Sequence, residues 1–203
     1  MIYKYLLLSS LLLCPFSTLA NNKPSSSEMA RLERGGIILK SIPQKGDGSR
    51  FQAWAIFDAS IKDVGEVLSD FKSYPKFMPD ITQTEVLSEK PTIVNYTLGL
   101  PMGMEKRYRL SHTVELGKAE LKLHWKQVTW NEVALGDSIK DTKGSWHLFE
   151  HKINKTLVFY DIYTDPGDVP FGFGWVVDYL SKESVPNVLK NTKAYLNNRS
   201  FRK

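Results

Sequence analysis

Residues 170–198 read PFGFGWVVDYLSKESVPNVLKNTKAYLNN and follow a long run of strand-like sequence. Apolar residues here recur at spacings of three and four, which predicts one stripe along a helix. The stripe comprises Val176, Tyr179, Leu180, Val188, Leu189, Thr192, Tyr195 and Leu196. Pro186 interrupts it, because proline lacks an amide hydrogen and its ring crowds the preceding turn. Ser184 could cap a renewed helix with Pro186 in its first turn, so the pattern predicts either one kinked helix or two in tandem.

This apolar stripe needs a matching apolar surface, and the strand-like sequence upstream is the only candidate. Alternation and turn signals predict strands at 36–43, 50–58, 81–88, 92–99, 104–115, 119–129, 143–151 and 155–164. Residues 104–115 and 119–129 alternate clearly between apolar and polar positions, which indicates an antiparallel sheet with one covered and one solvated face. The strand at 50–58 is fairly apolar on both faces. Short hairpin turns are expected at 116–118 and 152–154.

A short helix is predicted to begin at Ser60, where Asp63 completes an acidic variant of the capping box. The residues expected on its buried stripe are Val64, Val67, Leu68 and Phe71. The loop that follows, 70–80, carries more large apolar side chains than an exposed loop should, so it is expected to tuck inward or to bind something. Asp70 and Asp80 flank this loop. We expect them to close the helix end and to brace the turn, rather than to act as an acid–base pair.

The first twenty residues have the features of an export signal. Lys4 supplies a positive end, and residues 5–13 form an apolar run too short to span a bilayer comfortably. Small residues before position 21 place the expected cleavage after Ala20. A lipoprotein signal at Cys14 is the alternative, but Leu13 is bulky where such a signal needs a small residue. Cleavage would take 20 of the 203 residues and leave 183, without cysteine, because Cys14 is the only one.

Length and composition indicate one globular domain, since the chain is 42% hydrophobic and 24% charged. We divide it into a signal peptide (1–20), a polar leader (21–35) that is expected to be disordered at 21–27, a folded domain (36–198) and a basic tail (199–203). Removal of the Lys4 charge lowers the formal net charge from +5 to +4. That mild excess allows weak contact with an anionic membrane surface. It does not predict nucleic-acid binding. We expect a monomer that is periplasmic, or secreted in a host with a different envelope.

Two segments resemble a known superfamily. The first is Val67-Leu68-Ser69-Asp70-Phe71 with the proline-aromatic loop at 74–79, and the second runs from Gly144-Ser145-Trp146 to Asp165-Pro166-Gly167. Together with the order of strands and helices, they resemble the START-like, or SRPBCC, superfamily, in particular its polyketide-cyclase/dehydrase and coenzyme-Q-binding members. The resemblance covers roughly residues 36–198. It departs at Asp168, where a glycine is expected.

The resemblance implies an α+β helix-grip fold, in which a curved antiparallel sheet wraps around a long C-terminal helix. It also implies a cavity between helix and sheet for a lipid, quinone, sterol or polyketide-like molecule. Pockets for such ligands are mostly apolar, with a few polar groups that fix orientation. The residues that we expect to bind the ligand are Phe77, Met78, Tyr96, Tyr108, His112, Leu123, Trp125, Trp146, Tyr160, Trp175 and Tyr179.

His112 is the best candidate for acid–base chemistry, because histidine titrates near neutrality and this one lies on the apolar face of its strand. The alternative is a core histidine bonded to a neighbour. His147 and His151 lie about 13 Å apart along one strand, which is too far for shared metal ligation. His124 lies among lysines and is expected in solvent. We therefore predict no catalytic residue, no cofactor and no metal.

Three hypotheses remain. The first is an exported, non-catalytic protein that holds a hydrophobic small molecule. The second is an enzyme of the polyketide cyclase/dehydrase type, in which His112 and a pocket tyrosine transfer protons. The third is an interaction module that uses the fold only as a scaffold, which a filled interior would favour. The enzyme hypothesis needs His112, Tyr108 and another polar group to converge on one open cavity.

Overall fold

The computed structural model describes residues 23–167 and 183–200. The expected signal peptide, the first half of the expected C-terminal helix with Trp175 and Tyr179, and the end of the basic tail lie outside these residues. Arg199, which we assigned to the tail, lies instead in the last turn of the C-terminal helix.

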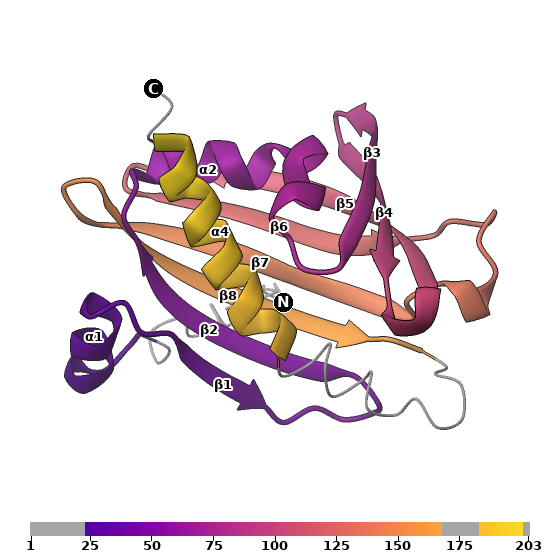
Figure 1. Ribbon diagram of the computed structural model, residues 1–203, viewed down its shortest axis with the longest axis horizontal. Coiled ribbons are helices and arrows are strands. Elements are labelled where there is room, and N and C mark those ends of the chain that lie inside the picture. Colours follow the sequence, from indigo (N-terminus) through magenta and orange to yellow (C-terminus); the bar gives the residue numbers. More distant parts are fainter. Residues whose placement is uncertain (1–22, 168–182, 201–203) are drawn as a thin grey trace, which may run out of the picture.

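Eight strands form one antiparallel sheet in the order β1-β2-β8-β7-β6-β5-β4-β3. The strands are β1 (Ile38–Ile42), β2 (Ser49–Phe57), β3 (Ile81–Glu89), β4 (Thr92–Gly99), β5 (Glu105–Leu116), β6 (Glu120–Val128), β7 (Asp141–Lys152) and β8 (Lys155–Asp165). Figure 1 shows β3 and β4 turned steeply relative to β7 and β8, so the sheet is strongly curved. The predicted strands are confirmed to within about two residues at their ends.

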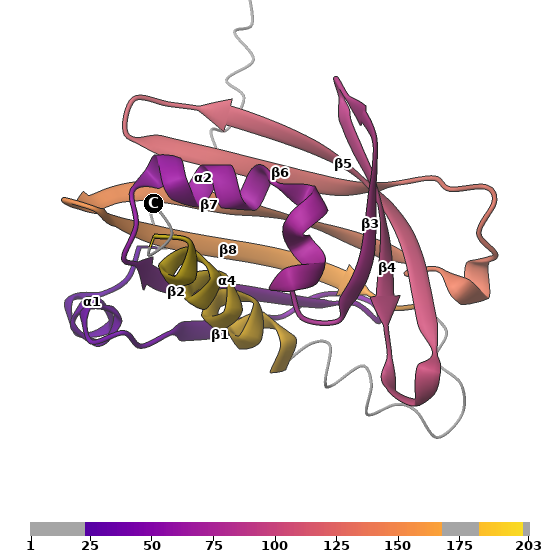
Figure 2. The same ribbon diagram turned by 45° about the horizontal axis from the view of Figure 1, so that its top comes forward.

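Helices α2 (Ile61–Ser69) and α4 (Ser184–Ser200) cover the same face of the sheet. In Figures 1 and 2 they lie next to each other across the strands, and the two helices are in direct contact. Their apolar sides join the inward residues of the sheet in one core, which includes Val67, Leu68, Leu123, Val158 and Leu189. The predicted α+β helix-grip fold is therefore confirmed.

Helix α2 begins as the capping pattern predicts. The Ser60 hydroxyl accepts a hydrogen bond from the Asp63 amide at 3.1 Å and donates one to its carboxylate at 2.6 Å. Asp70 closes the helix, and the 3₁₀ helix η1 (Phe71–Lys76) follows at once. Phe71, Tyr74 and Phe77 are buried, so the aromatic loop turns inward rather than standing in solvent.

Helix α4 begins at Ser184 with Pro186 in its first turn, where a missing amide hydrogen costs little. Its stripe is buried against the sheet at Val185, Val188, Leu189, Thr192 and Leu196. The Lys193 ammonium lies 3.1 Å from the Ile56 carbonyl and 3.0 Å from the Asp58 carboxylate, which ties the helix to the end of β2.

The disorder predicted for residues 21–27 is wrong at the end of that segment, and no helix was predicted in the rest of the polar leader. Residues Ser26–Glu33 form helix α1, whose Ser25 and Glu28 make a reciprocal capping box. Leu32 of α1 packs with Trp54 and Phe159 on the sheet face opposite α4. The polar composition hid the helix, because one buried leucine and a capping box suffice to dock two turns.

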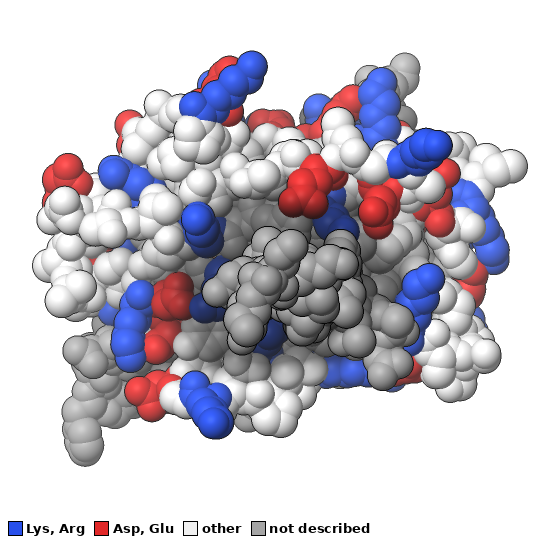
Figure 3. All heavy atoms as spheres, turned by 180° about the vertical axis from the view of Figure 1, so that it is seen from behind, with Lys and Arg blue, Asp and Glu red and all other residues white. Residues whose placement is uncertain are grey.

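Charged groups tie α1 to the end of β7 and join β2 to β8 on the outer face. Glu33 pairs with His151 at 2.5 Å and with Lys152 at 2.6 Å, and these contacts lower the pKa of the Glu33 carboxyl to about 2. Arg50 binds Asp161 through two hydrogen bonds of 2.9 and 2.7 Å. Figure 3 shows the molecule from behind, where basic and acidic side chains are mixed on the described part of the surface.

Candidate functional site

A cavity of about 140 Å³ lies between the curved sheet, the end of the aromatic loop and the start of α4. The described residues that line it come from β3 to β8, from the loop at 74–79, from the segment before β7 and from α4. They are Tyr74, Met78, Pro79, Ile81, Tyr96, Leu98, Tyr108, Leu110, His112, Leu123, Trp125, Ile139, Thr142, Trp146, Tyr160, Ile162, Thr164, Ser184 and Val188. Among these residues none is Asp, Glu, Lys or Arg.

Alternation along the strands places these side chains. Tyr96 in β4 is directly opposite Tyr108 in β5, and Trp146 in β7 is directly opposite Tyr160 in β8. Both members of a directly opposite pair point to the same face of a sheet, here toward α4. The Tyr96 and Tyr108 rings stack at 5.3 Å, and the Trp146 and Tyr160 rings lie 4.3 Å apart. The cavity thus has two aromatic walls.

Gly144 leaves room for the indole of Trp125 in the second wall. A Cβ atom at Gly144 would lie 2.4 Å from Trp125 and 2.3 Å from the Asp161 carbonyl. Trp125 is directly opposite Gly144 in the sheet and stacks on Tyr160 at 5.7 Å. The glycine therefore allows the indole to lie flat across the neighbouring strand.

His112 is buried with 5% of its surface exposed. Its Nε2 lies 2.9 Å from the Tyr96 hydroxyl, and its ring lies 4.3 Å from that of Phe71. Burial lowers the pKa of His112 from 6.5 to about 4, so the imidazole is neutral at pH 7. Its Nδ1 is enclosed and has no hydrogen-bond partner among the described residues.

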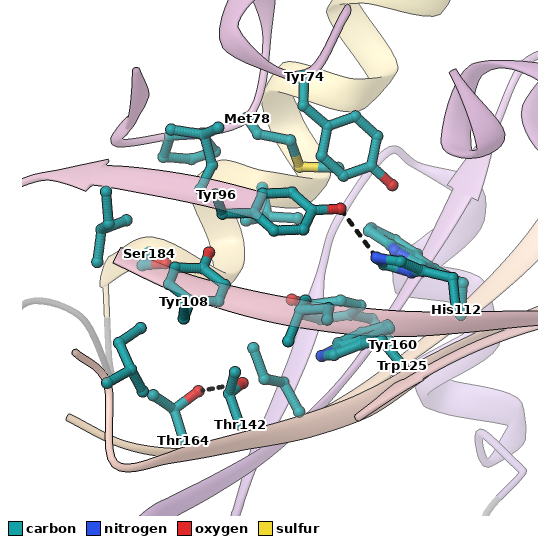
Figure 4. Close-up of a pocket in the computed structure, with 18 of the residues that line it drawn as sticks. Tyr74, Met78, Tyr96, Tyr108, His112, Trp125, Thr142, Tyr160, Thr164 and Ser184 are labelled. Carbon is teal, nitrogen blue, oxygen red and sulfur yellow. Dashed lines mark hydrogen bonds between the residues drawn. The ribbon is translucent and has the colours of Figure 1, made fainter. Parts of the chain in front are cut away.

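The four tyrosines of the cavity fall into two pairs (Figure 4). The Tyr74 hydroxyl donates to the Leu68 carbonyl at 2.6 Å, and the Tyr96 hydroxyl is bonded to His112. Dashed lines in Figure 4 join Tyr96 to His112 and Thr142 to Thr164, and none reaches Tyr108 or Tyr160. Two tyrosine hydroxyls are thus held by the fold, and the other two have no hydrogen-bond partner among the described residues.

Most of the residues expected to bind the ligand line this one cavity. Those that do are Met78, Tyr96, Tyr108, His112, Leu123, Trp125, Trp146 and Tyr160. Phe77 does not line it, because its ring turns toward α4 and stacks on Tyr195 at 4.6 Å. Trp175 and Tyr179 lie outside the described residues.

Sequence reasoning missed several lining residues. Thr142 and Thr164 lie directly opposite each other near one end of the cavity, with their hydroxyls 3.2 Å apart. Both face the interior at regular strand positions, so correct strand ends would have found them. Tyr74 was read only as part of the aromatic loop, and its position over the sheet depends on η1, which the pattern does not predict.

The other histidines are bound to carboxylates. His147 lies 2.7 Å from Glu120, and the exposed His124 lies 3.7 Å from Glu115. Within residues 23–167 and 183–200, no three His, Cys, Asp or Glu side chains are grouped so that they could hold a metal ion. In the same residues no helix has the length and apolar character needed to cross a membrane.

A family model described as polyketide cyclase / dehydrase and lipid transport matches residues 57–176. The match spans more than half of the chain, so the protein belongs to this family, and the predicted START-like resemblance is confirmed. No curated protein matches the chain.

Solved structures show the same fold. A STAR-related lipid transfer protein from Xanthomonas axonopodis is 20% identical, with 80% of this chain and 94% of that one covered and a TM-score of 0.69. Human StAR-related lipid transfer protein 5 is 12% identical, with a TM-score of 0.64; the match covers 87% of this chain and 94% of that one. The Zhui aromatase/cyclase from a Streptomyces species is 13% identical, with a TM-score of 0.56; the match covers 75% of this chain and 96% of that one.

Proposed function

We propose that this protein is exported and holds one hydrophobic small molecule in the cavity between its sheet and α4. The observation that supports this most is the cavity itself, which is lined by aromatic and aliphatic side chains and by few polar groups. Transfer of apolar surface from water into such a site contributes roughly 25 cal/mol per Å² before ordering costs. The lipid transfer proteins and the aromatase/cyclase that share the fold support a ligand of this general kind.

The state of His112 favours binding over catalysis. A general base works best when its pKa lies near the operating pH. Burial holds the pKa of His112 at about 4, and its Nε2 is already bonded to Tyr96. This pair therefore serves better as a rigid wall than as a proton acceptor at pH 7.

The direct test is extraction of the protein purified gently from its native compartment, followed by mass spectrometry. We expect a stoichiometric hydrophobic compound. Val188→Phe fills the α4 side of the cavity and should lower the amount recovered, whereas Val114→Phe makes the same change at an exposed position outside the lining. An empty wild-type protein, or equal recovery from both variants, would count against binding in this cavity.

Export has its own test. Intact mass measurement of the protein recovered from the periplasm or medium should give a chain that begins at Asn21. Retention of residues 1–20, or a lipid attached to Cys14, would contradict the proposed processing.

An enzyme of the polyketide cyclase/dehydrase type is the second candidate, because His112, Tyr96 and Tyr108 do converge on one cavity. It predicts that a poly-β-ketone thioester cyclises faster with the wild-type protein than in buffer, and that His112→Gln abolishes the difference. Equal product distributions with and without the protein would eliminate this candidate. The scaffold-only hypothesis is disfavoured, because a filled interior would favour it and the interior contains a cavity.

A further inference from the structure

The hydroxyls of Tyr108 and Tyr160 are polar groups of the cavity that have no hydrogen-bond partner among the described residues, as is Nδ1 of His112. Both residues are more than nine-tenths buried, with 8% and 5% of their surface exposed. We infer that Tyr108 and Tyr160 form a hydrogen-bond donor pair that selects a compact, neutral ring compound carrying a carbonyl oxygen. The inference rests on the proposed function, because it names the chemistry of the molecule that the same cavity takes.

The need for a partner comes from burial. Most buried polar side-chain atoms in folded proteins are hydrogen-bonded to protein or to ordered water. Tyr74 and Tyr96, the other two tyrosines of the lining, obey this rule through Leu68 and His112. Tyr108 and Tyr160 have no such bond, although they lie on the same surface (Figure 4). The acceptor must then come from the contents of the cavity, either a bound ligand or water.

Both hydroxyls are donors under all ordinary conditions. Burial raises the pKa of Tyr108 and of Tyr160 well above the usual value of 10, so neither becomes a phenolate. A phenol O–H donates one hydrogen bond, and a carbonyl oxygen has two lone pairs to accept with. One carbonyl, or two oxygens on one ring, is therefore the complementary group.

The lining also excludes a charged headgroup. Burial of an ion without an opposite charge is costly, so buried charges are paired. The described lining contains no Lys or Arg to meet a phosphate or carboxylate, and no Asp or Glu to meet an amine. The only titratable base, His112, is neutral at pH 7 because burial lowers its pKa to about 4. The polar end of the ligand is accordingly uncharged.

Size and shape limit the ligand further. The cavity of about 140 Å³ is close to the roughly 150 Å³ that holds a benzene molecule in an engineered protein cavity. Its walls are flat, with Tyr96 stacked on Tyr108 on one side and Trp125 stacked on Tyr160 on the other. Aromatic pairs gain from offset stacking beyond their buried area, so a planar ring fits these walls better than a flexible acyl chain.

Three probes of similar size test this, each titrated calorimetrically into the purified full chain. Acetophenone offers a ring and a carbonyl, cumene replaces the carbonyl oxygen by a methyl group, and benzoate carries a charge. The variants Tyr108→Phe and Tyr160→Phe remove one hydroxyl each and keep the ring. Tyr163→Phe is the matched control, because Tyr163 lies on β8 but faces the other side of the sheet, beneath Lys143.

We expect Tyr108→Phe and Tyr160→Phe each to weaken the binding of acetophenone by roughly five- to tenfold, the factor in affinity that one net hydrogen bond contributes. The same two variants should change the dissociation constant of cumene by less than about twofold. Tyr163→Phe should leave the dissociation constants of acetophenone and cumene unchanged, and benzoate should not bind measurably. Thermal denaturation of each variant would show that the fold is intact.

Two results would overturn the inference. If Tyr108→Phe and Tyr160→Phe weaken the binding of acetophenone and cumene equally, or weaken the binding of neither, the tyrosines do not select a carbonyl. Water is then their partner. If wild-type protein binds neither probe, or binds benzoate best, the ligand class is wrong. The proposed function is judged separately, because a hydrophobic compound extracted from the native protein would still support binding in this cavity.

Discussion

The hydroxyl of Tyr96 lies 2.9 Å from Nε2 of His112, and the two residues reach the same cavity from neighbouring strands of the sheet. The pair is shielded by Phe71, whose ring covers the imidazole at 4.3 Å. It fixes the orientation of two side chains of the cavity wall at once. Burial lowers the pKa of His112, so the stability of the protein should depend on pH in a definite direction.

Stability should fall as the pH drops from about 6.5 to about 4, because His112 is protonated in the unfolded chain over this range but not in the folded protein. The loss is about 1.4 kcal/mol per pH unit and roughly 3 kcal/mol in all. Urea denaturation at pH 7 and pH 5 measures it. His112→Gln should reduce the pH dependence. A variant profile parallel to that of the wild type would contradict this assignment.

Gly144→Ala should destabilise the protein by about 1–3 kcal/mol, the usual cost of overpacking. The new methyl group would lie against the Trp125 indole and the Asp161 carbonyl, so the indole must shift toward the cavity. Chemical denaturation gives the cost, and extraction shows whether less ligand is retained. Gly136→Ala is the control, since a Cβ there has no atom within 4 Å. Equal stability of the two variants would mean that the close contacts at Gly144 do not restrict the residue at this position.

Phe77→Ala and Met78→Ala should have different consequences although they are neighbours. Phe77 stacks on Tyr195 of α4, so its truncation should cost about 3–5 kcal/mol of stability. Met78 lines the cavity and is only half-buried, so its truncation should mainly lower ligand retention. Denaturation and mass spectrometry of both variants separate the two roles. The opposite ranking would place Phe77, rather than Met78, at the ligand.

Lys193→Met should cost about 1 kcal/mol of stability, because it removes the hydrogen bond to the Ile56 carbonyl and a half-exposed ion pair with Asp58. Denaturation at low and high salt measures both contributions, since only the ion pair is screened. Lys190→Met, at an exposed position of the same helix, should have little effect. An equal loss of stability in Lys190→Met would show that helix propensity, and not the contacts of Lys193 with Ile56 and Asp58, causes the effect.

Strand alternation made the sheet predictable, and it also predicted which side chains of β5 and β6 share the covered face. Tyr108 and Leu123 were assigned to that face by their spacing, whereas the cavity was implied by the resemblance to the START-like superfamily. Pattern reasoning failed where one contact outweighs composition. Helix α1 exists because Leu32 finds a site on the outer face, and Phe77 turns away because Tyr195 offers it a ring. The cavity volume depends on how all these side chains pack, and no periodicity encodes it.

The two ends of α4 have unequal attachments. Lys193 and Tyr195 fasten its second half to β2 and to the aromatic loop, whereas Ser184 and Val188 in its first half border the cavity. For the ligand that we propose, an exit past Ser184 would displace, among the described residues, only the first turns of α4, with the fastened half acting as a pivot. The residence time would then depend on the contacts of Val185 and Val188.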